Sequence, residues 1–224
     1  MRRGRRAYYD KFSTFYDRFV ALHSGDRQSL ARKFLVSQVS TQSGGSVLDL
    51  CTGTATLLTH LSATVGPHGR IVGVDFSHGM LKVAREKTRS FANVYLVEAD
   101  AGCLPFPAGT FDAVTCSHAF YELKGEAQER ALQEIVRVLR PEGAFLMMEH
   151  DVPANRFVRA LFYLRLAFIG AGRAIAFLRH EREALETYFG SVEKVAAPAG
   201  RSKIMICRKC EQADDNSTFV RRKE

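Results

Sequence analysis

The sequence predicts an α/β domain of the doubly wound type, in which helices cover both faces of a mostly parallel sheet. Short apolar runs alternate with segments that have apolar residues at helical spacing, which is the pattern of βαβ units. The apolar runs are continuous, as expected of strands that are buried on both faces. Hydrophobic residues make up 46% of the chain and charged residues 25%, which argues against a disordered, fibrous or membrane-embedded class.

Seven segments are the candidate strands, of which the first five are apolar runs. The first five alternate with helical segments and are expected to lie parallel, while the last two are expected to pair antiparallel at the edge of the sheet. In chain order, the segments are 47–50, 71–75, 94–97, 111–115, 144–148, 191–195 and 203–207.

Helices are predicted from apolar residues that recur every three to four positions. Between the strands they are expected near 55–64, 77–89 and 126–139. The last of these has one continuous apolar stripe, and the Pro-Glu-Gly at 141–143 ends it. Residues 10–38 have the same spacing and are predicted to form two helices that are separated near 24–26.

Charge and cysteine content exclude several classes. The net charge of +8 is concentrated partly at the two ends, where runs of basic residues are typical of solvated tails, and no nucleic-acid partner is expected. The N-terminus lacks the apolar segment of a secretory signal, so a cytoplasmic location is expected.

Five cysteines without framework spacing argue against a disulfide scaffold, and the lone pair Cys207 and Cys210 is too small for a structural zinc site. No metal is expected.

The residues after the strands are the candidate binding residues, because ligands of such sheets bind beyond the carboxyl ends of the strands. Gly53 follows the first strand and lets the backbone approach a ligand, although the pattern is neither the GxGxxG of NAD enzymes nor a P-loop. Asp75 follows the second strand, where a carboxylate can accept hydrogen bonds from ribose hydroxyls or cap the next helix. Asp100 follows the third strand, where its carboxylate could accept a hydrogen bond from an adenine amine or could simply be a solvated turn residue.

These segments resemble a known family. Residues 47–54, 72–81 and 99–101 look like the motifs of class I S-adenosylmethionine-dependent methyltransferases, and 104–107, 110–114 and 134–143 are similar to the ubiquinone/menaquinone C-methyltransferase-like (methyltransferase type 11) group. The resemblance covers roughly residues 8–150. It implies a Rossmann-like, doubly wound, seven-stranded sheet and an enzyme that uses S-adenosyl-L-methionine. Ala55 departs from the family, which usually has a further glycine at this position, and Pro-Glu-Gly replaces the commoner Pro-Gly-Gly before the fifth strand.

The resemblance also implies a division of the chain and a set of cofactor residues. The division is an N-terminal helical cap (1–45), the cofactor-binding core (46–150), a helical cap over the acceptor site (151–190), the final two strands (191–210) and a tail (211–224). The cofactor residues are Asp49, Thr52 and Gly53 for the methionine part, Asp75 for the ribose, Phe76 and Met80 for the adenine face, Asp100 and Ala101 for the adenine edge, and Ser117 near the sulfonium. Plain core packing is the alternative for Phe76 and Met80.

Methyl transfer is an in-line displacement in which positioning and desolvation carry most of the catalysis. A carbon or oxygen acceptor must also lose a proton, which a base with a pKa near the working pH assists. His118 is the first candidate because histidine titrates in that range, and Tyr121, Glu122 and His150 follow. The alternative for His118 is a neutral residue of the pocket wall.

The sequence leaves three hypotheses for the function open, two of which differ in the methyl acceptor. Residues 152–180 contain no acid and combine arginines with an apolar face, which fits a cap helix over the site or a basic surface that contacts anionic membrane through 156–179. The first hypothesis is methyl transfer to a small, apolar or quinone-like acceptor. The second is a phospholipid amine methyltransferase at the membrane surface, and the third is a non-catalytic S-adenosylmethionine-binding module. The sequence does not determine the oligomeric state.

Overall fold

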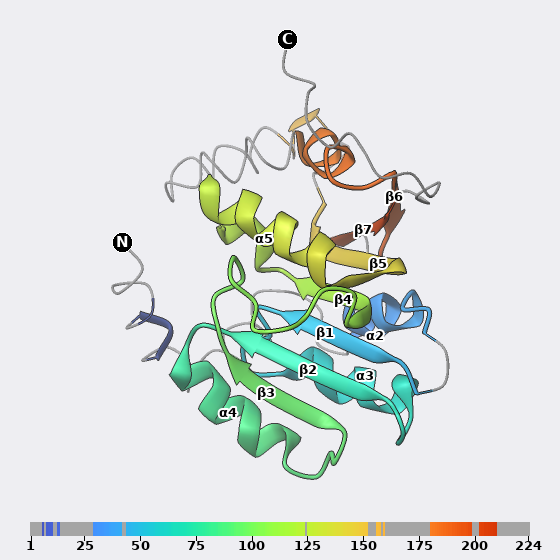
Figure 1. Ribbon diagram of the computed structural model, residues 1–224. Coiled ribbons are helices and arrows are strands. Elements are labelled where there is room, and N and C mark those ends of the chain that lie inside the picture. Colours follow the sequence, from blue (N-terminus) through green and yellow to red (C-terminus); the bar gives the residue numbers. More distant parts are fainter. Residues whose placement is uncertain are drawn as a thin grey trace.

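One seven-stranded sheet organises the molecule, as the computed structural model shows (Figure 1). The structure describes residues 6, 8–10, 13, 29–41, 44–123, 125–151, 156, 157, 159, 180–198 and 202–209. The strand order is β3-β2-β1-β4-β5-β7-β6. The strands are β1 (Ser46–Leu50), β2 (Arg70–Asp75), β3 (Val94–Glu98), β4 (Phe111–Ser117), β5 (Leu139–His150), β6 (Ser191–Ala196) and β7 (Ser202–Arg208).

The first five strands are parallel, and β7 is antiparallel to both of its neighbours, β5 and β6. The predicted fold class, a mostly parallel sheet with an antiparallel end, is therefore confirmed. The antiparallel strand lies one position inside the sheet, because β7 pairs on both sides and β6 forms the edge.

Helices cover both faces of the sheet (Figure 1). They are α2 (Leu30–Ser37), α3 (Thr56–Val65), α4 (His78–Thr88) and α5 (Glu126–Val138), with a single 3-10 turn, η1, at Phe120–Glu122. Alternate residues of β5 show the two faces: Phe145 and Met147 pack in a cluster with α5, while Leu146 and Met148 pack in a cluster with α2 and α3. Residues 180–186 are also helical, and Leu185 packs on the α5 side.

The start of β5 was predicted wrongly. The strand begins at Leu139, directly after α5, and not at 144. Leu139 pairs with Phe111, and the ladder then shifts register before Ala113 pairs with Ala144. The intervening residues form a bulge, which accommodates a proline without a backbone donor. The first of the two helices predicted within 10–38 lies almost entirely outside the described residues, and the second corresponds to α2.

Candidate functional site

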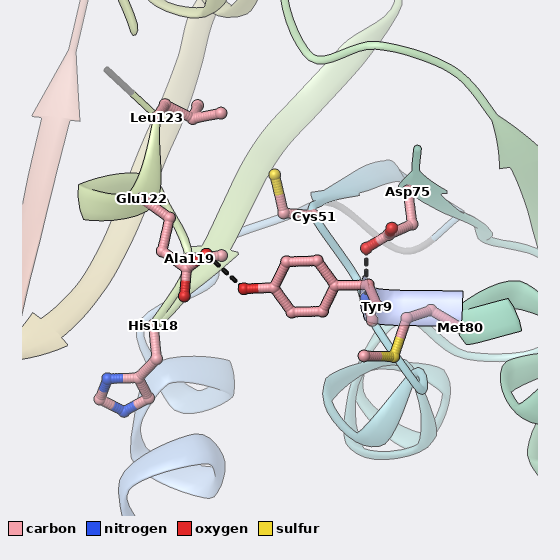
Figure 2. Close-up of a pocket in the computed structure, with 9 residues that line it drawn as sticks. Tyr9, Cys51, Asp75, Met80, His118, Ala119, Glu122 and Leu123 are labelled. Atoms are coloured by element: carbon pink, nitrogen blue, oxygen red, sulfur yellow. Dashed lines mark hydrogen bonds between the residues drawn. The ribbon is translucent and has the colours of Figure 1, made fainter. Parts of the chain in front are cut away.

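A pocket opens at the carboxyl ends of β1, β2 and β4, where the strand order reverses between β1 and β4. Such a reversal is the usual ligand site of an open α/β sheet. The lining residues are Tyr9, Cys51, Gly53, Asp75, Met80, His118, Ala119, Glu122 and Leu123 (Figure 2). The structure thus brings together five of the residues predicted to bind the cofactor or to act in catalysis, namely Gly53, Asp75, Met80, His118 and Glu122.

The loop between β1 and α3 folds back over the end of β2. The Thr52 amide donates to the carbonyl of Val74 at 2.9 Å, and the Gly53 amide donates to Asp75 Oδ2 at 2.9 Å. Cys51, Gly53 and Ala55 all have positive φ, at 55°, 56° and 62°. The amides of Thr52 and Gly53 thus fix the loop to the end of β2, and the positive φ angles favour glycine at each of these positions.

Ala55 is the departure from the family pattern, and it adopts the left-handed conformation that glycine tolerates best. Ala55→Gly is therefore expected to raise the free energy of unfolding by about 1 kcal/mol, because relief of backbone strain exceeds the added chain entropy of the unfolded state. Urea denaturation checks this, with Ala113→Gly, which lies in β4, as the matched control that should destabilise. A loss of stability in Ala55→Gly would show that the alanine methyl group packs usefully.

Asp49 lies beneath this loop and does not line the pocket. Its carboxylate accepts hydrogen bonds from the hydroxyls of Thr52 at 2.6 Å and Thr115 at 2.8 Å, and only 2% of the residue is exposed. Burial raises the pKa of Asp49 to about 6. In this arrangement Asp49 and Thr52 hold the shape of the loop that presents Gly53.

Asp75 is the acidic side chain at the centre of the cofactor side. Its two oxygens accept from the amides of Gly53 and Ser77, each at 2.9 Å, and burial raises its pKa. A carboxylate has about four acceptor positions, so acceptor capacity remains for ribose hydroxyls. The alternative, that Asp75 caps the next helix, is wrong: Ser77 is the N-cap of α4, and its hydroxyl accepts from the Met80 amide.

Tyr9 reaches the pocket from the N-terminal segment and had no signal in the sequence. Its hydroxyl donates to Glu122, so the ring crosses the pocket between Asp75 and Glu122 (Figure 2). The ring also meets Phe76 edge-on, with 5.9 Å between centroids. Phe76, predicted to contact adenine, therefore packs beside the pocket against this tyrosine.

Asp10 anchors the same segment to the start of α4. Its Oδ1 accepts from the Ser77 hydroxyl at 2.7 Å and from the Gly79 amide at 2.8 Å, and the Gly79 amide is the main reason that the pKa of Asp10 is lowered. A Cβ on Gly79 would lie 2.6 Å from the Asp10 Cα, so only glycine permits this approach. Arg6 also pairs with Glu98 at the end of β3. The N-terminal residues therefore form one wall of the site.

His118 follows β4 on the opposite side of the pocket. It has φ 53°, and its amide donates to the carbonyl of Met148 at 2.8 Å. The centroid of its ring lies 4.6 Å from that of His150, and the ring centroids of Tyr121 and His150 are 6.4 Å apart. His118, Tyr121 and His150 are thus neighbours, and of the four catalytic candidates His118 and Glu122 line the pocket.

His118 was predicted to act as a base because histidine usually titrates near neutral pH, and in the structure its pKa lies well below that range. Burial, reinforced by His150, lowers the pKa of His118 to about 3, so the imidazole is neutral at neutral pH. Among the described residues, its buried Nδ1 and the buried hydroxyl of Ser117 have no hydrogen-bond partner. Polar atoms of this kind are available to a ligand.

Two predicted adenine contacts lie away from the pocket lining. Asp100 Oδ1 accepts from the Gly102 amide at 2.9 Å, so the side chain closes its own turn. Ala101 is 7% exposed and packs in the core cluster on the α5 side. Neither contributes to the pocket, and their contact with a cofactor stays a prediction.

Other predictions concern the remainder of the chain. The membrane surface at 156–179 falls outside the described residues except for Arg156, Phe157 and Arg159. Within the described ranges, none of the helices has the length and apolar character to cross a bilayer, and no three potential ligands cluster as a metal site. Cys207 is buried in β7, which raises its pKa to about 12, whereas Cys210 lies outside the described part.

Comparison with known proteins gives consistent matches. Residues 5–177 match the model of the ubiE/COQ5 methyltransferase family. A demethylmenaquinone methyltransferase of Anoxybacillus flavithermus is 36% identical over 163 residues, which cover 72% of this chain and 68% of that protein. One of Staphylococcus carnosus is 34% identical over 161 residues, again 72% of this chain. The match spans 66% of the length of the Staphylococcus relative, slightly less than two thirds.

The fold is shared with solved structures as well. A SAM-dependent methyltransferase from Aquifex aeolicus superposes with a TM-score of 0.59 at 20% identity, over 81% of this chain and 92% of that chain. At this identity the likeness shows the fold alone.

Proposed function

The chain belongs to the ubiE/COQ5 methyltransferase family, and from this premise we propose that it transfers the methyl group of S-adenosylmethionine to a ring carbon of an apolar quinol. Membership of this family supports the predicted enzyme class, a methyltransferase, and the predicted cofactor, S-adenosylmethionine. The acceptor is our proposal, and the names of the relatives, demethylmenaquinone methyltransferases, support it.

One observation carries the proposal: cofactor-side and acceptor-side residues line the same pocket. Gly53 and Asp75 offer a backbone amide loop and a carboxylate with spare acceptor positions, and Met80 offers an apolar surface. His118 also lines the pocket, and its buried Nδ1, like the buried hydroxyl of the adjacent Ser117, has no partner among the described residues. These groups fit the polar, ribose-containing cofactor on one side and a hydroxyl-bearing ring on the other.

When bound, S-adenosylmethionine supplies an electrophilic methyl carbon on a sulfonium. The loop at Gly53 and the Asp75 carboxylate would hold its amino-acid and ribose parts, and the wall formed by Tyr9 would exclude water. His118 accepts a hydrogen bond from the acceptor hydroxyl at its buried Nδ1 and thereby orients the ring. These roles consist of positioning and desolvation, which a reaction with a good neutral leaving group chiefly requires.

The acceptor must be the reduced quinol, because an oxidised quinone ring is poor in electrons and its carbon is not nucleophilic. A carbon–carbon bond forms, the carbon–sulfur bond breaks, and the ring proton leaves. Carbon attack by a neutral quinol leaves a strongly acidic, cationic ring. Even an imidazole with a pKa near 3 can therefore take up the proton, so neutral His118 suits this chemistry.

His118→Asn and His118→Phe are expected to lower kcat about 100-fold while the Kd of S-adenosylhomocysteine changes little. Asparagine tolerates the positive φ of this position, and phenylalanine preserves the ring volume, so the two variants separate the imidazole nitrogens from backbone and packing effects. Steady-state kinetics and titration calorimetry measure the two quantities. An equal fall of turnover and cofactor affinity in both variants would assign His118 a structural role.

The acceptor is tested by incubating the purified chain with S-adenosylmethionine that carries a deuterated methyl group. The candidate acceptors are a short-chain demethylmenaquinone reduced with dithionite, the same compound left oxidised, and vesicles of phosphatidylethanolamine. We expect a labelled methyl group on the reduced compound alone, detected by mass spectrometry. Label on the phospholipid would replace the proposal by amine methylation. Cofactor binding without turnover on any of the three would contradict the proposed reaction.

A further inference from the structure

Glu149 is a fully buried acid near the end of β5, on the face that is otherwise occupied by the apolar residues Phe145 and Met147. It is in register with Lys203 of the neighbouring strand β7. An acidic side chain without exposure is uncommon in a core and requires partners. Phe145 and Met147, which precede Glu149 on the same face of β5, already belong to the hydrophobic core of this face.

The partners of Glu149 are backbone amides of the turn η1. Its Oε1 accepts from the Tyr121 amide at 3.2 Å, and the Phe120 amide also donates to the carboxyl group. The first amides of a helical turn have no partner within the turn, and a capping side chain usually supplies one. Here the preceding residue is Ala119, which has no side chain that can cap. Glu149 therefore caps the turn from an adjacent strand.

The turn that Glu149 caps carries the acceptor side of the pocket. Ala119 and Glu122 line the pocket, and Tyr121 faces His150. Glu122 also receives the hydroxyl of Tyr9 and so joins the turn to the N-terminal wall. A shift of the turn would move these residues together.

The charges around Glu149 favour its neutral form. Lys203 of β7 donates to Glu181 of the helical segment 180–186, so this ammonium group is already paired. Cys116 of β4 faces Glu149 as a thiol whose pKa is raised. Burial, reinforced by Glu181, raises the pKa of Glu149 to about 8. At neutral pH the cap is therefore an uncharged carboxylic acid, whose carbonyl oxygen can accept from the amides.

We propose that Glu149 is a positioning residue, which holds the Phe120–Glu122 turn and with it the acceptor side of the pocket through the backbone of Phe120 and Tyr121. The expected change in kcat rests on the proposed function, whereas the structural role of Glu149 in holding the turn does not. The side chain lies beneath the turn and acts through it, and it is not a group that touches the methyl donor or the acceptor.

The test compares Glu149→Gln, which keeps an uncharged acceptor oxygen, with Glu149→Leu, which has a similar volume and no acceptor. Leu146→Ala is the matched control, because Leu146 is equally buried on the opposite face of β5. Three quantities are measured for each variant: amide hydrogen exchange of residues 118–123, the Kd of S-adenosylhomocysteine, and kcat with a reduced short-chain demethylmenaquinone.

We expect Glu149→Leu to lose exchange protection at Phe120 and Tyr121 and to lower kcat about 100-fold, with cofactor affinity nearly unchanged. Glu149→Gln should resemble the wild type in all three measurements. Leu146→Ala should destabilise the chain without affecting the turn amides or kcat. Retained protection in Glu149→Leu, or equal loss in Leu146→Ala, would overturn the proposal.

The exchange measurement needs no acceptor, so it separates two failures. If the wild type methylates none of the quinols, the proposed acceptor is wrong. Selective loss of protection in Glu149→Leu, restored in Glu149→Gln, would still support the positioning role. If the wild type is active and protection is unaffected by Glu149→Leu, the positioning role alone is wrong.

Discussion

Asp75→Ala is expected to weaken the binding of S-adenosylmethionine about 10²- to 10⁴-fold, which is the largest effect that we foresee for a single substitution. Under the proposed function, the variant loses the carboxylate that would accept a charge-assisted hydrogen bond from the ribose, and such a bond contributes about 1.5–3 kcal/mol. It also releases the Gly53 amide, which donates to Asp75 Oδ2 at 2.9 Å, so the loop that faces the methionine part loses its support. A loss of stability of about 1–3 kcal/mol should accompany the loss of affinity.

Titration calorimetry with S-adenosylhomocysteine measures the affinity, and thermal unfolding without ligand measures the stability. Asp112→Ala is a suitable control. Asp112 accepts from the Ser46 amide at 2.7 Å and pairs with Arg140 at the far end of β4, so its loss should reduce stability and leave affinity intact. Wild-type affinity in a folded Asp75→Ala variant would show that the cofactor does not bind at the end of β2.

Glu149→Gln is expected to change the pH dependence of stability. The pKa of Glu149 is about 8 in the folded chain against an ordinary value of 4.5, so unfolding releases a proton in this range. Stability of the wild type should therefore fall as the pH rises from about 4.5 to about 8, and this contribution is constant above that range. The glutamine variant lacks the fall. The two proteins should be nearly equal in stability at pH 4, and the variant should be more stable by a few kcal/mol at pH 8, of the order of 5 at most.

Urea denaturation at a series of pH values measures this difference. Other groups also titrate, since the pKa of Asp49 is raised to about 6 and that of His118 is lowered to about 3, but they contribute equally to both proteins. The His118 contribution has the opposite sign, because a neutral buried imidazole loses stability as the pH falls below 6.5. A constant difference between wild type and Glu149→Gln from pH 4 to 8 would show that folding does not raise the pKa of Glu149.

The sequence predicted the sheet and part of the site because both depend on local patterns. Continuous apolar runs between helical segments are sufficient for the five parallel strands, and the carboxyl ends of parallel strands meet at one edge. Gly53, Asp75 and His118 each follow a different strand, and all three line the pocket. The bulge at the start of β5 was missed, since its register depends on pairing with β4.

What the sequence could not provide depends on contacts between distant segments. Tyr9 meets Glu122 across 113 positions of the chain, and no local pattern marks it as a residue of the pocket. The pKa of His118 follows from burial beside His150, which only the folded structure provides. Glu149 was not singled out either, because its role as a cap comes from a turn that precedes it by 28 residues.

The central claim is that the pocket at the ends of β1, β2 and β4 binds S-adenosylmethionine. Calorimetric titration of the wild-type chain with S-adenosylmethionine, S-adenosylhomocysteine and NAD tests it most directly. We predict saturable binding of the first two with Kd values in the micromolar range, which corresponds to about −8 kcal/mol, and no heat with NAD. Absence of binding with both sulfur compounds, or binding of NAD in their place, would contradict the account.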